Sequence, residues 1–362
     1  MHSWWESISK ARSRIHLLSS LLPSSPDDED PLSSLADTDR PARSLLLSAA
    51  AYSSVSAAIS SPSSGSGEDP LCHWLYDTYL SSDPDLRLVV LSYLPLISSI
   101  YLRRIHHPAS DTPVSLSGFE AVLLALYSSE TKARNGKPVT ISIPDLSQPS
   151  LYHSPRNSVK SSNSNSKPSK PLVGVLSPPL EPQMAVKSTK RACIVGVALD
   201  CYYKQISQMP RWSKLDFWHE NGDEFGNDIR VEADEIENVA ERVNDLAIEN
   251  YNSVEVGDKD AKIPLPWELL QPVLRILGHC LLGPLNVDEV KDAASMAVRR
   301  LYARASHDLV PQAILATRSL IQLDKRAREA ANAASTAAAY ASGSNANTPS
   351  KAKKPEILLV SK

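Results

Sequence analysis

The feature that most constrains the fold of this chain is a run of fifteen residues without charge, 88–102, which reads LVVLSYLPLISSIYL. A membrane-spanning helix needs about 20 predominantly apolar residues, and shorter runs are more often buried core helices. Arg87 precedes the run and Arg103 and Arg104 follow it, so charge limits its length on both sides. We therefore predict that this stretch lies in the centre of a protein core and does not span a membrane.

Pro95 lies in the middle of this run. A proline inside a helix removes one backbone N–H donor and clashes with the preceding turn, which kinks or breaks the helix. We therefore expect a kinked helix or two short helices here.

Composition narrows the class of protein. The chain has 362 residues, of which 42% are hydrophobic, and its net charge is -3. A nearly neutral chain has no whole-protein attraction to nucleic acid or to anionic lipid. Glycine is scarce, with 12 residues in total, and no array of short strands is evident, so helices are favoured.

The cysteines indicate a reducing compartment. No two of them form a CxxC pair and no signal peptide precedes them, which is typical of reduced thiols in a cytosolic protein. Neither end carries a lipidation motif, so we expect no membrane anchor in the chain itself. The four cysteines are Cys72, Cys193, Cys201 and Cys280.

The first segment shows helical periodicity. Apolar residues recur at spacings of three and four and predict an amphipathic helix docked on the core. Three basic residues beside them, Lys10, Arg12 and Arg14, leave a membrane-surface helix as the alternative. The predicted stripe consists of Trp4, Ile8, Ala11, Ile15, Leu18 and Leu22.

Helix starts are marked by capping residues. An N-cap side chain accepts a hydrogen bond from a free N–H group of the first turn, and proline is tolerated just after the cap. The signals are Asp-Pro at 69–70 and 83–84, Ser117 with Glu120, and Asn286 with Glu289.

After Gly136 the pattern changes to a proline-rich strap (residues 137–155) with alternating apolar positions, which predicts an extended segment with one short strand. A segment rich in Ser, Asn, Lys and Pro follows and predicts a disordered loop over 156–183. Altogether we predict an all-α protein of about ten helices. One irregular helical domain covers 1–335, with the loop inserted, and a disordered tail covers 336–362.

Catalytic and metal-binding motifs are lacking. The sequence has no phosphate-binding glycine loop, nucleophile elbow or HExxH pair. Adjacent Cys72–His73 and His279–Cys280 point in different directions on a helix, so neither pair predicts a metal site. The acidic segment 221–228 lacks the spacing of a calcium loop. We expect no enzyme, no cofactor and no bound metal.

Three blocks carry a resemblance to a known family: DPLCHWLYDTYLSSDPDLRLVVLSYLPLISSIYL (69–102), SLSGFEAVLLALYSSE (115–130) and ISIPDLSQPSLYHSP (141–155). In order, spacing and residues they resemble the hyccin family. The serine-rich loop that follows suggests a plant member.

The resemblance implies a non-enzymatic, all-helical subunit of the phosphatidylinositol 4-kinase type III alpha complex, which makes phosphatidylinositol 4-phosphate. Such a subunit packs against a tetratricopeptide-repeat scaffold, which in plants is of the no-pollen-germination type. A separate peripheral anchor protein holds the complex at the plasma membrane. We therefore expect this chain in the cytosol and, through its partners, at the plasma membrane, where it stabilises and recruits the kinase.

The strap offers the first interface residues, because apolar side chains on an extended segment can lie in a groove between helices. The alternative is that the strap seals the core of this protein. The predicted partner-binding residues are Ile143, Pro144, Leu146, Pro149, Leu151 and Tyr152.

A different class of function stays open on the residues alone. A free-standing α-helical adaptor would bind anionic membrane surfaces through its own basic segments. These would be the first helix and the loop with Arg156, Lys160, Lys167 and Lys170.

Overall fold

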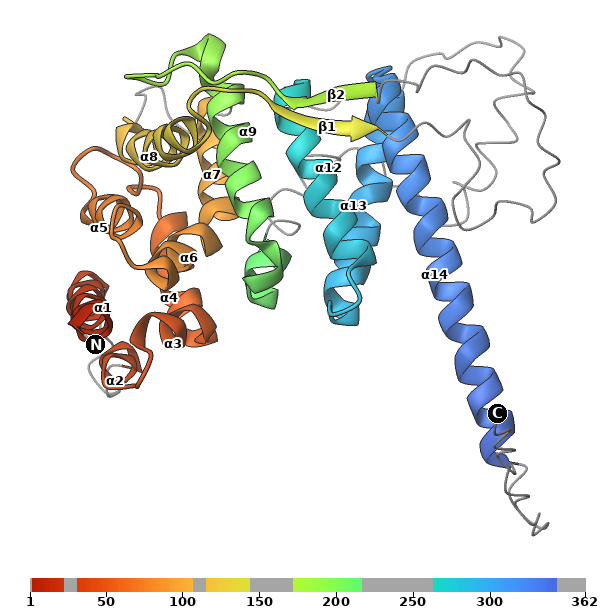
Figure 1. Cartoon of the computed structure of the whole chain (residues 1–362), viewed down its shortest axis with the longest axis horizontal. Coiled ribbons are helices and arrows are strands. Elements are labelled where there is room, and N and C mark those ends of the chain that lie inside the picture. The colour runs from red at the N-terminus through yellow and green to blue at the C-terminus, as the bar shows by residue number, and fades with distance from the viewer. Residues whose placement is uncertain (1, 23–30, 107–114, 144–171, 217–262, 344–362) are drawn as a thin grey trace, which may run out of the picture. The chain divides into compact units, whose positions relative to one another are not determined.

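Helices dominate the computed structural model, which describes residues 2–22, 31–106, 115–143, 172–216 and 263–343 (Figure 1). The all-α prediction is confirmed, and the only sheet in the described part has two strands. The helices are α1 (His2–Leu21), α2 (Pro31–Ala36), α3 (Pro41–Leu47), α4 (Ala49–Ser60), α5 (Pro70–Tyr79), α6 (Pro84–Ser92), α7 (Leu94–His106), α8 (Ser117–Arg134), α9 (Ser188–Lys204), η1 (Ile206–Gln208), α12 (Trp267–Leu282), α13 (Asp288–His307) and α14 (Pro311–Gly343), and the strands are β1 (Val139–Ile143) and β2 (Leu172–Ser177).

The described residues divide into two compact units. The first holds everything up to residue 216 and residues 263–276, which include the first part of α12. The second holds residues 277–343, and there α13 packs along α14. The prediction of one helical domain over 1–335 stays a prediction.

The uncharged run 88–102 is buried at every position, so its assignment to the core is confirmed. Its helix breaks in two, as predicted: α6 ends at Ser92, α7 begins at Leu94, and their axes differ by 41°. The break places Pro95 in the first turn of α7. Backbone N–H groups there have no partner within the helix, so the missing N–H of proline costs no hydrogen bond. No single described helix is long and apolar enough to cross a membrane, and α6 and α7 meet that test only when taken together.

Helix α1 packs its apolar stripe against α2, α3 and α5. The stripe is buried from Ile8 to Leu22, which confirms the docked helix. Trp74 of α5 donates its indole N–H to the carbonyl oxygen of Arg14 over 2.8 Å and ties the two helices together. Trp4 is the exception: it lies in the same register, but it is 54% exposed.

The two Asp-Pro helix starts are confirmed. Asp69 accepts a hydrogen bond from the N–H of Leu71 at the start of α5. Asp83 accepts from the N–H groups of Asp85 and Leu86 at the start of α6. Each aspartate thus satisfies backbone donors that a helix leaves unpaired in its first turn.

The capping box predicted at Ser117 and Glu120 is wrong. Ser117 is already the first residue of α8, and no side chain caps this helix. The N–H groups of Gly118 and Phe119 donate instead to the carbonyl oxygen of Gly65, which lies in the loop between α4 and α5. A tertiary contact therefore replaces the local cap.

The cap predicted at Asn286 and Glu289 is also wrong, because Val287 precedes α13 without a side-chain hydrogen bond. Asn286 donates its amide N–H groups to the carbonyl oxygens of His279 and Cys280, over 2.7 and 3.1 Å. It therefore caps the end of the preceding helix, α12, where carbonyl groups lack helical partners.

Two element boundaries differ from the predictions. Strand β2 (Leu172–Ser177) forms within the range predicted as loop, and α14 continues to Gly343, beyond the predicted start of the tail. The alanine-rich sequence after residue 330 has a high helix propensity, which explains the longer helix. The acidic segment 221–228 and the final residues 344–362 lie outside the described residues.

Candidate partner-binding surface

The two strands form an isolated antiparallel pair, here called the ribbon (Figure 1). Ile143 pairs with Leu172 at one end, and Val139 pairs with Ser177 at the other. The register slips by one residue next to Val139, so a bulge lies near that end. Because successive side chains of a strand point to opposite faces, this register determines what each face of the ribbon carries.

One face carries Ile141, Ile143 and Leu172, and the other carries Val173 and Val175. These five side chains are between 37% and 68% exposed. A lone two-stranded ribbon is marginally stable in water, and contiguous exposed apolar side chains mark interaction sites. The ribbon is therefore the candidate partner-binding surface of this chain.

Of the predicted partner-binding residues, the structure describes one. Ile143 is exposed at the end of β1. The others lie outside the described residues, so their role stays a prediction: Pro144, Leu146, Pro149, Leu151 and Tyr152.

Sequence reasoning missed the second strand of this surface. Leu172, Val173 and Val175 fall in a range that was predicted as loop from its serine, lysine and proline content. A short run of branched apolar residues, LVGVL, was the available signal. Its pairing with a strand on the far side of the loop could not be read from local sequence.

The chain passes from the end of α8 into the ribbon through a tight turn. Asn135 and Gly136 both have positive φ, of 48° and 69°, and end the helix in the left-handed conformation. The N–H of Leu180 donates to the carbonyl oxygen of Gly136 over 3.0 Å. Tyr127 donates its hydroxyl to the carbonyl oxygen of Glu181 over 2.8 Å. Both arms of the ribbon are thus attached to α8.

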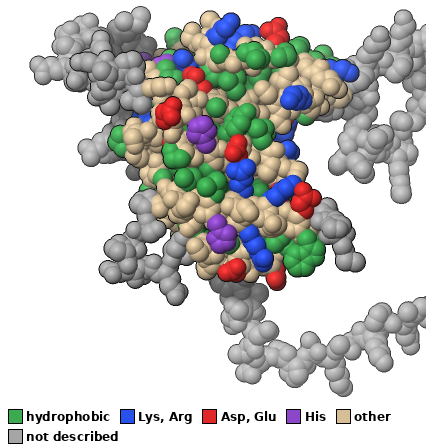
Figure 2. Space-filling view, turned by 90° about the vertical axis from the view of Figure 1, so that its left-hand side faces the viewer, with side chains coloured by type: hydrophobic (Ala, Val, Ile, Leu, Met, Phe, Trp, Pro, Cys, Tyr) green, Lys and Arg blue, Asp and Glu red, His purple; other side chains and the backbone are tan. Residues whose placement is uncertain are grey.

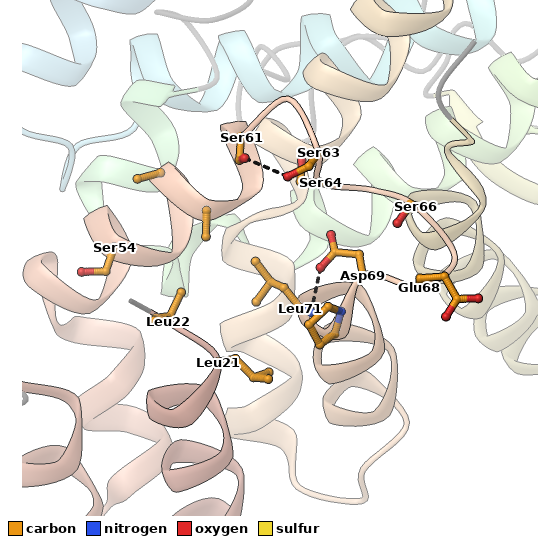
Figure 3. A pocket seen from close by; sticks show the side chains of 13 residues that line it. Leu21, Leu22, Ser54, Ser61, Ser63, Ser64, Ser66, Glu68, Asp69 and Leu71 are labelled. Carbon is orange, nitrogen blue, oxygen red and sulfur yellow. Dashed lines mark hydrogen bonds between the residues drawn. The ribbon is translucent and has the colours of Figure 1, made fainter. Parts of the chain in front are cut away.

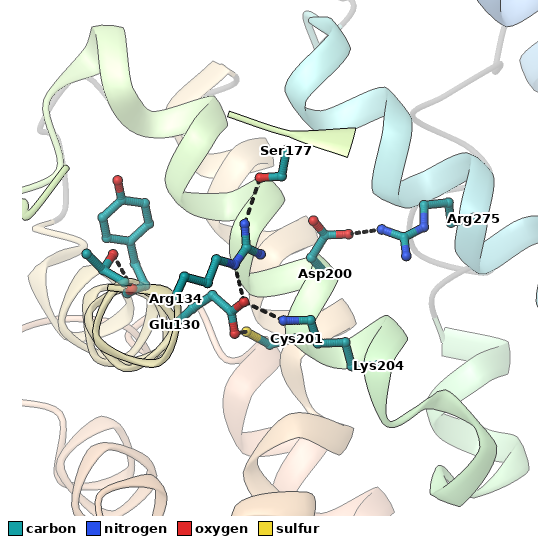
Figure 4. A network of polar contacts seen from close by, with 9 residues as sticks. Glu130, Arg134, Ser177, Asp200, Cys201, Lys204 and Arg275 are labelled. Carbon is teal, nitrogen blue, oxygen red and sulfur yellow. Dashed lines mark hydrogen bonds and ion pairs between the residues drawn. The ribbon is translucent and has the colours of Figure 1, made fainter. Parts of the chain in front are cut away.

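A polar group fixes the same end of the ribbon. This group, here called the anchor cluster, consists of Glu130, Arg134, Ser177, Cys201 and Lys204 (Figure 4). The guanidinium of Arg134 donates to the hydroxyl of Ser177 over 2.8 Å and also pairs with Glu130. Lys204 donates to the same carboxylate, and the thiol of Cys201 contacts it at 3.8 Å. The cluster joins α8, α9 and the last residue of β2.

The electrostatics of the cluster favour the charged carboxylate. Burial raises the pKa of Glu130, but the hydrogen bonds and charges of Lys204 and Arg134 outweigh burial and hold that pKa below its usual value. Burial, followed by the charge of Glu130, raises the pKa of the Cys201 thiol to about 12. Cys201 therefore stays protonated at neutral pH and is a poor nucleophile.

On its other side α9 is held by α12, within the first unit. Asp200 pairs with Arg275 at 2.7 Å, and the guanidinium of Arg275 lies 4.1 Å from the ring centre of Tyr203 (Figure 4). Gly196 allows the helices to touch, because a β-carbon there would overlap the carbonyl oxygen of Glu268. Helix α9 is thus fixed between α8 and α12, and it carries Cys201 and Lys204 of the anchor cluster.

A model of the Hyccin family matches residues 36–354. The chain belongs to the hyccin family. The matched range contains all three sequence blocks that carry the resemblance, both strands of the ribbon and every residue of the anchor cluster. The candidate surface is therefore part of the hyccin domain.

The hyccin fold of this chain also has a cleft of about 560 Å³ in the first unit (Figure 3). Its walls are the end of α1, the end of α4 and the loop that leads into α5. Leu21, Leu22 and several serines line it, among them Ser54 and Ser61. This lining mixes aliphatic and hydroxyl side chains, so the apolar ribbon remains the candidate surface.

Within its described residues, this hyccin chain has no candidate metal site. No group of three or more His, Cys, Asp or Glu side chains that could hold a metal occurs there. His73 hydrogen-bonds the carbonyl oxygen of Gly67 over 2.8 Å. Its neighbour Cys72 contacts the capping carboxylate of Asp69, and burial raises the pKa of its thiol.

Proposed function

We propose that this chain is a non-catalytic subunit of the phosphatidylinositol 4-kinase type III alpha complex. It binds a tetratricopeptide-repeat scaffold and helps to stabilise and recruit the kinase at the plasma membrane, where the complex makes phosphatidylinositol 4-phosphate. Membership of the hyccin family supports this role. The observation that carries it is the exposed, firmly anchored ribbon.

A protein partner explains why the ribbon is apolar. Fully burying a Val, Leu or Ile side chain stabilises by about 1.5–3 kcal/mol, and roughly half of each ribbon side chain is still exposed. Five such side chains would then contribute several kcal/mol to binding, before the cost of association. Helical repeats offer extended concave surfaces with apolar grooves, which suit a projecting ribbon.

The proposed attachment to the membrane is indirect, through the scaffold and a peripheral anchor protein. The basic residues of α1 are already engaged within the chain: Lys10 pairs with an acidic side chain of the same helix, Arg12 donates to a carbonyl oxygen of α2, and Arg14 pairs with Asp77. On the face shown in Figure 2, basic and acidic side chains are interspersed. Stable attachment to a bilayer takes two signals, and the basic residues of α1 supply one weak signal at most.

Co-purification tests the proposal. The tagged chain is expressed with the scaffold and the kinase, as wild type, as the double variant Ile141→Asp with Leu172→Asp, and as Leu80→Asp. Leu80 is an exposed apolar residue outside the ribbon and serves as the matched control. We expect the wild type and the control to retain scaffold and kinase and the double variant to lose at least nine-tenths of both.

A second arm tests the membrane-adaptor alternative. The purified chain is mixed with phosphatidylserine vesicles at physiological salt and sedimented. We expect it to stay in the supernatant and to sediment only together with the scaffold and the anchor protein. Sedimentation of the chain alone, or a wild-type chain that retains no scaffold, would contradict the proposal.

A further inference from the structure

We infer that the ribbon inserts edge-first into an open apolar slot of its partner, so that both of its faces are covered, and does not dock flat on one face. This inference rests on the proposed function, in which the ribbon contacts the scaffold.

The first observation is the composition of the two faces. A ribbon that docks on one face keeps the other face polar, and its strands alternate between apolar and polar residues. Strand β1 follows this alternation, with Thr140 and Ser142 on the second face, but β2 does not. Leu172 is exposed on one face, and Val173 and Val175 are exposed on the other. Apolar side chains are therefore exposed on both faces, and a partner that covers both buries more apolar surface.

The second observation is that the ribbon lacks charge. The strands read VTISI and LVGVLS and hold no charged residue. Exposed sheet edges of natural proteins are normally protected by lysine, proline or inward-pointing charges. Within the strands no such residue occurs, although Pro138 and Pro144 flank β1, and Pro171 and Pro178 flank β2. The edge that enters the slot carries unpaired N–H and C=O groups, so the floor of the slot must offer hydrogen-bonding groups to them.

The third observation is that the ribbon is thin. Gly174 lies opposite Ile141, and a β-carbon built there would approach the side chains of Ile143 and Ile141 to 3.2 and 3.4 Å. The isoleucine side chains thus lie over the glycine, which flattens this face. A flat ribbon fits between two helices more readily than a thick one.

The partner chemistry follows from these faces. The walls of the slot are apolar and carry few charges, because the ribbon brings none to pair with them, and the floor of the slot offers hydrogen-bonding groups to the strand edge. The slot is open along its length, because the chain continues from Ile143 to Leu172 through residues 144–171 and cannot be threaded through a closed hole. A groove between neighbouring helical repeats of the scaffold has this form.

The test compares the two faces with threonine variants, because threonine has the branched β-carbon that favours strands and exposes less apolar surface than Ile, Leu or Val. One variant combines Ile141→Thr with Leu172→Thr, and the other combines Val173→Thr with Val175→Thr. Leu80→Thr is the control. The dissociation constant for the purified scaffold is measured for each full-length protein, together with the thermal unfolding midpoint of the chain alone.

We expect each double variant to bind the scaffold at least tenfold more weakly, with an unchanged unfolding midpoint, while the control binds like the wild type. If only one of the two double variants binds the scaffold more weakly, the ribbon docks flat on that face. Insertion is then overturned, and the proposed function stands. If the wild type binds the scaffold and both double variants bind it equally well, the ribbon is not the interface. A wild type that does not bind the scaffold overturns both proposals. A lowered unfolding midpoint for either variant shows that the chain itself covers that face, which also overturns insertion.

Discussion

Replacing Gly196 by alanine tests the close approach of α9 and α12. On helix propensity alone, Gly→Ala inside a helix stabilises by about 1 kcal/mol. Here the added methyl group would overlap the carbonyl oxygen of Glu268 and lie 3.1 Å from its carbonyl carbon. Backbone cannot rotate away as a flexible side chain can, so the two helices must separate. Overpacking of this kind costs about 1–3 kcal/mol.

The cost should lie at the upper end of that range. Separation of the helices also disturbs the ion pair of Asp200 with Arg275, one turn further along α9. Subtracting the gain in propensity leaves a net destabilisation of about 2 kcal/mol. Urea titration followed by circular dichroism measures it as a lower unfolding midpoint of Gly196→Ala.

The chain contains a matched control for this experiment. Gly278 lies inside α12, as Gly196 lies inside α9. A β-carbon at Gly278 would meet only the side chain of Leu320, at an ordinary 3.6 Å. Gly278→Ala should therefore leave stability unchanged or raise it by up to about 1 kcal/mol. If Gly196→Ala is as stable as Gly278→Ala, the helices do not pack through this glycine and the reasoning is refuted.

Three further predictions concern the core, the anchor cluster and the loop. Leu94→Asp, at a fully buried position, should abolish recovery of folded protein because it buries an unpaired charge, and a folded variant in gel filtration would contradict the core assignment. The fold lowers the pKa of Glu130 from its usual value of 4.5. The charged Glu130 carboxylate therefore stabilises the fold fully when the pH is well above 4.5, and this stabilisation is lost as the pH falls through the lowered pKa. Glu130→Gln should therefore unfold more easily than the wild type at pH 7, and the gap should close in acid; a gap independent of pH would contradict this role. Replacing residues 156–171 by a shorter Gly/Ser linker should barely change the melting temperature, since halving a loop changes the closure cost by only about 0.6 kcal/mol, and a large fall would show that the segment packs on the domain.

The sequence predicted best where a short-range rule decides the structure. The buried run was recognisable because its length, its lack of charge and Pro95 all agree. The Asp-Pro helix starts at Asp69 and Asp83 were recognisable because the cap and its donors lie within three residues of each other.

Prediction failed where the partner is distant in sequence. The start of α8 is satisfied by Gly65 and not by the neighbouring Ser117, and Asn286 turns back to the helix before it. Strand β2 pairs across a long intervening segment, so the composition of that segment concealed it. Trp4 fits the apolar stripe, but periodicity cannot tell that this residue stays 54% exposed.

The start of α8 has a consequence for the order in which the protein assembles. Its first amides are paired with Gly65, more than fifty residues upstream, and an added β-carbon at Gly118 would overlap the carbonyl oxygen of Ser66. Helix α8 can therefore complete its first turn only after the loop between α4 and α5 has reached its final path. In hydrogen exchange, the amides of Gly118 and Phe119 should then open together with that loop, as parts of one cooperative unit, and not with the rest of their own helix.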